Sequence, residues 1–279
     1  MNSDHIRYYV YEKLRLFFSD NKVPELEDKP KPCSRMKMLL DMPQLSWSVI
    51  EKHSWSLTDK SPNIHVDLHD PTRCFRMRPT HTTDCVRGRV GYSKGTHSWE
   101  IYWPDNQRGS HPLIGVATAE APLYCPEFQT LIGGNKHSWA WNLTTNRLYH
   151  DSGVIPSQPY PKFKSGGQDY VAPNSITVIL NMDAGQLSFA VNGKDLGVAF
   201  HGLQGKVLYP AINTVSGFND ISIRYTGELK PGPPSLKAMC RIAIRKSLRL
   251  FRIGITDILI SWDIPRPLAH YVGTTASFT

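Results

Sequence analysis

The stretch GTHSWEIYW at residues 95–103 decides the fold class. Its residues Trp99, Ile101 and Trp103 alternate with more polar side chains, which is the period of a β-strand that buries one face. Further short runs rich in valine, isoleucine and aromatic residues occur at residues 64–68, 113–117, 175–180, 186–191 and 220–225. Many short strands separated by turn residues predict a mainly β protein, either a sandwich or a barrel.

Turn residues support this interpretation at one hairpin in particular. Asp183-Ala-Gly185 and Asn192-Gly193 bracket residues 186–191, and an Asn-Gly pair favours the two-residue turn of a hairpin. The sequence therefore predicts a hairpin strand at residues 186–191.

The two ends of the chain differ from the β pattern. Residues 1–20 have helical spacing and residues 21–32 are charged and contain prolines, so we expect a helix followed by a linker. This helix could dock on the main domain, bind a partner or a membrane surface, or be an artefact of gene prediction. A proline cluster at residues 230–234 ends the β pattern. We expect an N-terminal segment at residues 1–35, a β domain at residues 36–229 and a helical tail at residues 230–279.

Helical spacing returns in the tail. Leu236, Cys240 and Ile244 lie four residues apart, which places them on one stripe of a helix. Ser235 is the expected N-cap and Gly254 the expected end of this helix, and a second short helix is expected at residues 257–261.

The formal net charge of +8 suggests a nucleic-acid binder, but its distribution argues against one. Residues 230–279 carry eight Lys or Arg against two acids, so the tail holds six of the eight net charges and the β domain is almost neutral. No stretch reaches the ~18 apolar residues of a membrane-spanning helix. Charges also interrupt the first twenty residues, which argues against a signal peptide. We expect no nucleic-acid partner and no membrane partner.

The five cysteines and eleven histidines form no recognisable chemical site. The cysteine number is odd and no pair has C-x-x-C spacing, so we expect free thiols, a reducing cytoplasmic location and no metal. Cys85 beside Arg87 could have a lowered thiol pKa, and His97 could act as a base, but both lie in predicted strands and fit packing roles better. No metalloprotease, nucleophile-elbow or nucleotide-binding motif occurs. We expect no catalytic residue, no cofactor and no enzyme activity.

Several motifs, in order, resemble the SPRY domain. They are DCVRGRVGYSKGTHSWEIYW at residues 84–103, QRG at 107–109, AEAPL at 119–123, SWAW at 138–141, LYH at 148–150, LNMD at 180–183 and LYP at 208–210. With the tail, the chain resembles the gustavus-like family of SPRY domain- and SOCS box-containing proteins over about residues 36–271. The resemblance implies a bent β-sandwich whose loops capture a short Asn-rich, acid-led peptide of a target. It also implies a tail that recruits elongin B, elongin C and a cullin of the fifth type, so that the target is ubiquitinated.

The resemblance implies a set of peptide-binding positions in the loops. They are Pro79, His81, Arg108, Gly109, Ser110, Phe128, Leu131, Val215, Ser216 and Gly217. Arg108 offers a fork of donors for carbonyls or carboxylates, and Gly109 lets a ligand backbone come close. Five positions depart from the family: Ser110 replaces Thr, Phe128 replaces Tyr, Met77 replaces Arg, His81 replaces a small residue and Ser216 replaces a wall-forming Trp. Since aromatic side chains dominate interface energies, we expect weakened or altered peptide specificity.

The resemblance also assigns roles within the tail. Leu236, Met239, Cys240 and Ile244 bind elongin, and Ile264, Pro265, Leu268 and Tyr271 contact the cullin. The stripe has no partner within a small tail, so we expect it in an apolar groove of elongin C, the alternative being that it packs on the sandwich. Asp263 replaces a proline and Trp262 a leucine, and a charge at an apolar contact carries a desolvation cost.

Elongin binding is therefore the firmer expectation, and cullin binding the weaker one. The alternative function is a SPRY interaction module without ligase recruitment. In that case the basic helix at residues 241–252 would contact calmodulin or an acidic membrane.

Overall fold

The computed structural model describes residues 35–77, 81–161, 170–215, 217–230, 235–248 and 255–274. They form two units, which we treat separately. The β unit lies within residues 45–232, and the helical unit consists of the described residues up to 44 together with those after 233. The helix predicted at residues 1–20 and the linker at residues 21–32 lie outside the described residues.

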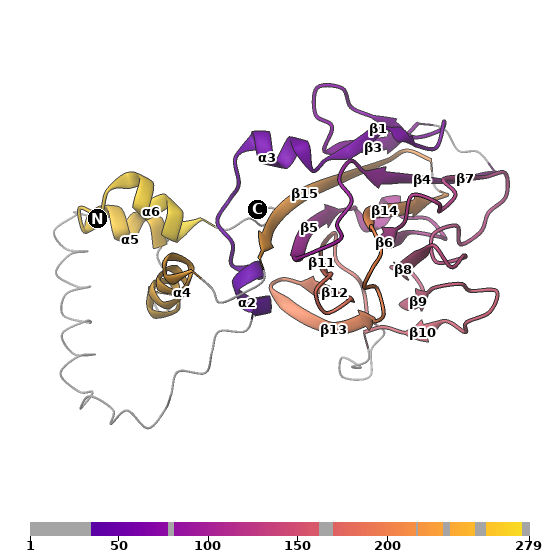
Figure 1. Ribbon diagram of the computed structural model, residues 1–279. Coiled ribbons are helices and arrows are strands. Elements are labelled where there is room, and N and C mark those ends of the chain that lie inside the picture. Colours follow the sequence, from indigo (N-terminus) through magenta and orange to yellow (C-terminus); the bar gives the residue numbers. More distant parts are fainter. Residues whose placement is uncertain are drawn as a thin grey trace. The chain divides into compact units, whose positions relative to one another are not determined.

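The β unit contains two antiparallel sheets (Figure 1). One has the strand order β1-β4-β14-β6-β8-β9-β10, with β7 paired to β4, and the other has the order β13-β12-β11-β5-β15-β3-β2. The strands are β1 Trp55–Lys60, β2 His65–Val66, β3 Arg73–Arg76, β4 Thr83–Gly88, β5 Thr96–Tyr102, β6 Leu113–Ala117, β7 Tyr124–Cys125, β8 Ser138–Asn142, β9 Arg147–Tyr149, β10 Gln158–Pro159, β11 Ser175–Asn181, β12 Gln186–Val191, β13 Lys194–Phe200, β14 Tyr209–Thr214 and β15 Asn219–Leu229. The predicted mainly β, antiparallel sandwich is confirmed.

Alternation along the strands explains why two sheets pack together. In β5, Trp99 and Ile101 belong to the main core, and Trp103 follows them there. In β6, Ile114 and Val116 enter the same core, whereas the neighbouring Leu113 and Ala117 lie in a second cluster with Ala121, Leu131 and Ile132. The first sheet is therefore buried on both faces, because the chain between β6 and β8 covers its outer side.

The predicted hairpin is confirmed. Asn192 and Gly193 both have positive φ, at 51° and 72°, as a two-residue turn between twisted strands requires. Val191 pairs with Lys194 across this turn, between β12 and β13. Elsewhere the boundaries differ from the expectation. The run at residues 64–68 pairs only over β2, and β15 extends well past residue 225 because a bulge between Tyr225 and Gly227 lets pairing with β5 continue.

The helices are short. The helical unit contains α2 Arg35–Leu40, α4 Leu236–Leu248, α5 Ile255–Ser261 and α6 Arg266–Gly273, while α3 Trp47–Lys52 and the 3₁₀ turn η1 Asp105–Gln107 belong to the β unit. The predicted N-cap is confirmed, because the Ser235 hydroxyl accepts a hydrogen bond of 3.2 Å from the Ala238 amide.

The helical unit has a small core of Leu259, Ala269 and Val272. Helices α5 and α6 approach so closely that a Cβ on Gly273 would lie 1.9 Å from the Thr256 hydroxyl. One domain boundary differs from the expectation, since residues 36–44 group with the C-terminal helices and the β unit begins at Leu45. The side chain of Asp41 accounts for this difference, as shown below.

Candidate functional sites

Four loops gather at one end of the sandwich, which we call the loop end: residues 77–82, 105–112, 126–131 and 215–218. Strand pairing brings them together. Asp84 at the start of β4 pairs with Thr214 at the end of β14, and Asn213 pairs with Leu113 at the start of β6. The described positions that the resemblance assigned to peptide binding lie in or beside these loops.

A buried ion pair fixes two of the loops. Arg76 and Asp84 are fully buried, and their Nε and Oδ2 atoms are 2.7 Å apart. The Arg76 guanidinium also donates to the Val215 carbonyl and, at 3.0 Å, to the Thr82 carbonyl. A buried pair is tolerated only when further hydrogen bonds satisfy both partners, and here those bonds hold residues 82 and 215 in place.

Two polar strand residues fix the remaining loops. The Asn213 side chain accepts a hydrogen bond of 3.0 Å from the Leu131 amide and donates one of 2.9 Å to the His111 carbonyl. The Thr83 hydroxyl donates to the Glu127 carbonyl at 2.6 Å and accepts from the Gln129 amide at 2.9 Å. The loop end is therefore a rigid scaffold, as recognition by loops requires.

The loop end exposes several apolar or aromatic side chains beside polar ones such as Asp105 and Glu127. His81 and the half-exposed Phe128 have ring centroids 5.4 Å apart, and Met77 and Phe218 are also exposed. Gly109 is exposed with φ at 65°, a conformation that glycine adopts without strain. Ser110 is exposed and bonds to the neighbouring His111 ring at 2.8 Å.

Arg108 occupies a different position from the one its expected role suggests. It is buried, and its guanidinium donates to the carbonyls of Trp103, Ala172 and Pro173. Burial lowers the pKa of Arg108, and the charge of Asp105 opposes this shift. Its donors therefore bind carbonyls of the domain itself, and Arg108 stabilises the loop end from inside the β unit.

The other expected peptide-binding positions divide into surface and support. Leu131 and Val215 are buried and Gly217 is half-buried. Pro79 and Ser216 lie outside the described residues. The structure thus brings His81, Gly109, Ser110 and Phe128 to the surface of the loop end.

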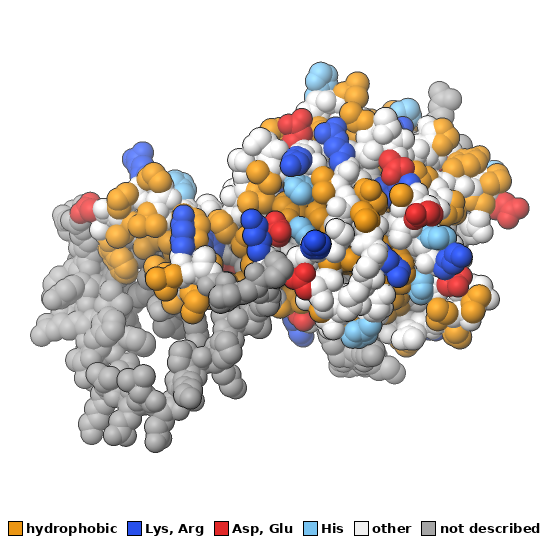
Figure 2. All heavy atoms as spheres, viewed as in Figure 1, with side chains coloured by type: hydrophobic (Ala, Val, Ile, Leu, Met, Phe, Trp, Pro, Cys, Tyr) orange, Lys and Arg blue, Asp and Glu red, His pale blue; other side chains and the backbone are white. Residues whose placement is uncertain are grey.

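The helical unit carries the second candidate site, on α4. Leu236 is 75% exposed, Met239 50% and Ile244 40%, and Cys240 is exposed between them. We call these four side chains the apolar stripe. Figure 2 shows hydrophobic side chains at the surface of the helical unit.

The opposite face of α4 carries two buried arginines. Arg245 Nε is 2.9 Å from Asp41 Oδ1, and Arg241 lies 3.6 Å from Asp41 Oδ2 and also donates to the Asp41 carbonyl. The remaining donors bind carbonyls at the end of α6. Arg241 reaches Tyr271 at 2.6 Å and also Thr274, and Arg245 reaches Val272 and Gly273 at 2.7 and 2.8 Å. We call this network the arginine clamp.

Sequence reasoning missed the arginine clamp. Arg241 and Arg245 are four residues apart on the face away from the stripe, but Asp41 precedes them by some 200 residues, so no local spacing connects them. The carbonyls at the end of α6 attract cations through the helix dipole. Burial lowers the pKa of Arg241, and the charge of Asp41 is the largest opposing effect.

The expected cullin-contacting residues lie around α6. Pro265 and Leu268 are exposed, whereas Ile264 and Tyr271 pack partly against the small core. Asp263 has φ at 57° and follows α5 directly. A proline cannot adopt this φ, so the divergence at residue 263 also changes the backbone of this turn.

The structure also shows the surroundings of Cys85 and His97, the two residues considered for a catalytic role. Burial raises the pKa of the Cys85 thiol well above its ordinary value, with Asp84 adding to the shift and Arg87 opposing it. His97 bonds to the Tyr225 hydroxyl and the Lys94 carbonyl, at 2.9 and 2.8 Å. Within the described residues, no group of three His, Cys, Asp or Glu could hold a metal ion, and no helix is long and apolar enough to span a membrane.

The SPRY domain model matches residues 96–224. Among solved structures, the SPRY domain of human HERC1 matches 62% of this chain and 98% of that chain at 18% identity, with a TM-score of 0.47.

Three relatives match most of the chain. Human SPRY domain-containing SOCS box protein 1 is 44% identical over 245 residues, covering 88% of this chain and 88% of that protein. Protein gustavus of Drosophila melanogaster is 44% identical over 245 residues, covering 88% and 87%. Human SPRY domain-containing SOCS box protein 2 is 40% identical over 238 residues, covering 85% and 88%. The chain belongs to the family of SPRY domain-containing SOCS box proteins.

Proposed function

We propose that this protein is a non-catalytic, cytoplasmic adaptor of an elongin–cullin ubiquitin ligase. The loop end binds a peptide of a client protein, and the apolar stripe on α4 binds elongin C within the elongin B/C complex. The client is then presented for ubiquitination. The observation that carries this proposal is the exposure of the stripe on a helix whose other face is already occupied by the arginine clamp.

The stripe has the chemistry of a helix that lies in a groove. Leu236, Met239 and Ile244 are each exposed by 40% or more. Full burial of such a side chain contributes roughly 1.5–3 kcal/mol. Side chains at positions i, i+3, i+4 and i+8 form the anchors of helix-in-groove recognition. A partner with an apolar groove would therefore gain several anchors from one short helix.

Cullin recruitment is the less supported part of the proposal. Leu268 and Pro265 are exposed and available to a partner, but Asp263 adds a charge to the same turn. Removing a carboxylate from water at an apolar contact carries a desolvation cost. We therefore expect a cullin to bind more weakly than the elongins.

The client peptide is also expected to differ from the family's usual one. The loop end exposes Phe128 where a hydroxyl would be usual and Met77 where a guanidinium would be usual. An acid-led peptide loses a cation at one position, and a polar peptide loses a hydrogen bond at the other. Apolar client side chains fit these two exposed side chains better.

The free thiols support the proposed cytoplasmic location. Cys74, Cys85, Cys125 and Cys240 are free among the described residues. Free thiols persist in a reducing compartment, which supports the cytoplasm as the place of action.

Binding to purified elongin B/C tests the proposal. The full-length protein is compared with Leu236→Ser and Ile244→Ser by biolayer interferometry, and Phe128→Ala serves as the loop-end variant. We expect the two stripe variants to bind elongins at least tenfold more weakly and to keep the client peptide. Elongin binding that survives both stripe substitutions would leave only an interaction module without ligase recruitment.

A further inference from the structure

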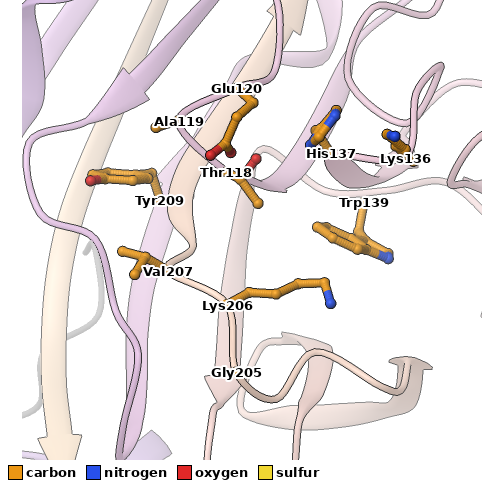
Figure 3. Close-up of a pocket in the computed structure, with 10 residues that line it drawn as sticks. All are labelled: Thr118, Ala119, Glu120, Lys136, His137, Trp139, Gly205, Lys206, Val207 and Tyr209. Carbon is orange, nitrogen blue, oxygen red and sulfur yellow. The ribbon is translucent and has the colours of Figure 1, made fainter.

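A pocket of about 560 Å³ lies on the β unit, away from the loop end (Figure 3). Its walls come from the chain after β6, from the start of β8 and from the chain before β14. Tyr209 of β14 and Ser138 of β8 both pair with Ala117, at the end of β6 opposite Leu113. With about 3.4 Å per residue, β6 separates the pocket from the loop end by roughly 14 Å.

The pocket has a fixed aromatic wall. Trp139 is buried and stacks on His150, with ring centroids 4.5 Å apart and planes at 16°. Val207 and Tyr209 face it across the hollow in Figure 3. A hollow of this volume with a buried aromatic side chain in its wall is large enough to receive a ligand group.

The charges around this hollow are unevenly distributed. Lys206 lies 5.8 Å from the centroid of the Trp139 ring, and Lys136 lies on the same side, whereas Glu120 lies across the pocket (Figure 3). No ion pair satisfies either lysine within the part of the chain that the structure describes. The neighbouring Thr118 hydroxyl is the largest cause that lowers the pKa of Glu120.

We propose that this basic pocket, formed by Lys136, Trp139, Lys206, Val207 and Tyr209, binds a client peptide that carries an acidic side chain next to an apolar one. The acidic group pairs with the two ammonium groups, and the apolar group packs between Trp139 and Val207. Glu120 repels an acid on its own side and thereby sets the direction of the peptide.

The proposal rests on the client-binding role and adds a second contact to it. A client held at both ends of β6 gains affinity through the linkage of two weak sites, provided that its chain can span the distance. An extended segment of about five residues is long enough. This second contact compensates for weaker client binding at the altered loop end.

Fluorescence anisotropy with a defined probe tests the basic pocket. The probe is a fluorescein-labelled, end-capped hexapeptide in which glutamate and leucine alternate, and the reference probe has glutamine in place of glutamate. We expect the full-length protein to bind the glutamate probe at least tenfold more tightly at 50 mM salt. The preference should shrink at 0.5 M salt, because screening weakens contacts between exposed charges.

Charge reversal locates the binding. Lys136→Glu with Lys206→Glu should remove the preference, and Lys136→Gln with Lys206→Gln should reduce it. The matched control is Lys52→Glu with Lys94→Glu, which changes the net charge equally at exposed lysines outside the pocket. Equal affinity for both probes, or equal loss in pocket and control variants, would overturn the proposal. Elongin binding by the same samples is measured separately, so a failure of the adaptor function remains distinguishable.

Discussion

The arginine clamp gives the most informative prediction, which concerns the substitution Asp41→Ala. This change removes the carboxylate that lies 2.9 Å from Arg245 and 3.6 Å from Arg241. Both arginine side chains are almost fully buried, at 2% and 8% exposure. The substitution therefore leaves two buried cations without a counter-ion.

The magnitude decides what should happen to the helical unit. Breaking a buried ion pair from one side typically costs about 3–5 kcal/mol. A unit as small as this one, with a core of Leu259, Ala269 and Val272, rarely has more than about 3–5 kcal/mol of stability. Because the cost equals the whole stability, we expect the unit to unfold locally. The apolar stripe would then lose its helical spacing, and elongin binding would fall with it.

Hydrogen exchange measures this directly. Amides of α4 in Asp41→Ala should exchange at least about 100-fold faster than in the unaltered protein, since 1.4 kcal/mol corresponds to a factor of ten. Amides of β5 and β11 should not change, because they belong to the β unit. Asp41→Asn keeps an acceptor for Arg245 and should fall between the two.

The matched control is Asp257→Ala, which removes an exposed carboxylate of α5 in the same unit. We expect it to leave α4 exchange unchanged. If Asp41→Ala accelerated α4 exchange no more than Asp257→Ala, the arginine clamp would not hold the helix, and the reasoning from buried charge would be refuted.

Three further predictions concern the β unit. Arg108→Ala should lower the free energy of unfolding by about 2–4 kcal/mol, because it leaves the carbonyls of residues 103, 172 and 173 unpaired. Urea denaturation followed by tryptophan fluorescence measures this free energy. A change below about 0.5 kcal/mol would contradict the prediction. Burial, with smaller effects of His97 and Lys52, lowers the pKa of His53 from 6.5 to about 4. Between these pH values the unfolded state binds more protons than the folded state, so the free energy of unfolding should fall by about 1–3 kcal/mol as the pH drops from 6.5 to 4. His53→Gln should make the stability of the protein less dependent on pH in thermal unfolding, and an unchanged pH dependence would assign it to other groups. Phe128→Tyr combined with Ser216→Trp should raise affinity for an Asn-rich, acid-led peptide at least tenfold in calorimetric titration, whereas tight binding by the unaltered protein would show that the departures at these positions do not matter.

The parts of this protein that the sequence predicted all depend on local spacing. The alternation at residues 95–103 predicts which side chains of β5 enter the main core, and Asn192-Gly193 predicts the turn after β12. The expectation that β5 buries only one face is wrong, because the polar side chains between them, such as Ser98 and Glu100, are buried as well. Ser235 caps α4 because its hydroxyl needs only an amide three residues ahead. The exposed stripe on α4 follows from spacing in the same way.

The parts that could not be predicted depend on contacts between distant residues. From the sequence alone, the donors of Arg108 fit the carbonyls of a client as well as those of the domain itself. They bind the domain because the carbonyls of residues 172 and 173 lie within reach in the folded structure. The boundary near residue 36 shifts to Leu45 because Asp41 belongs to the arginine clamp. The exposure of Phe128 likewise depends on the bond between Thr83 and the Gln129 amide.

Helix α4 reverses the usual distribution of side chains, with Arg241 and Arg245 inside and the stripe outside. Burying two guanidinium groups is unfavourable unless their donors are satisfied. Asp41 and the carbonyls at the end of α6 satisfy them here, and this requires α2, α4 and α6 to meet in one geometry. Apolar side chains at positions 241 and 245 would stabilise the unit without fixing the direction in which this face of α4 points. Helix α4 would then be free to rotate and bury the apolar stripe. Because the guanidinium groups must point inward to their acceptors, such a rotation is unfavourable, and Leu236 and Ile244 stay on the outer face of the helical unit.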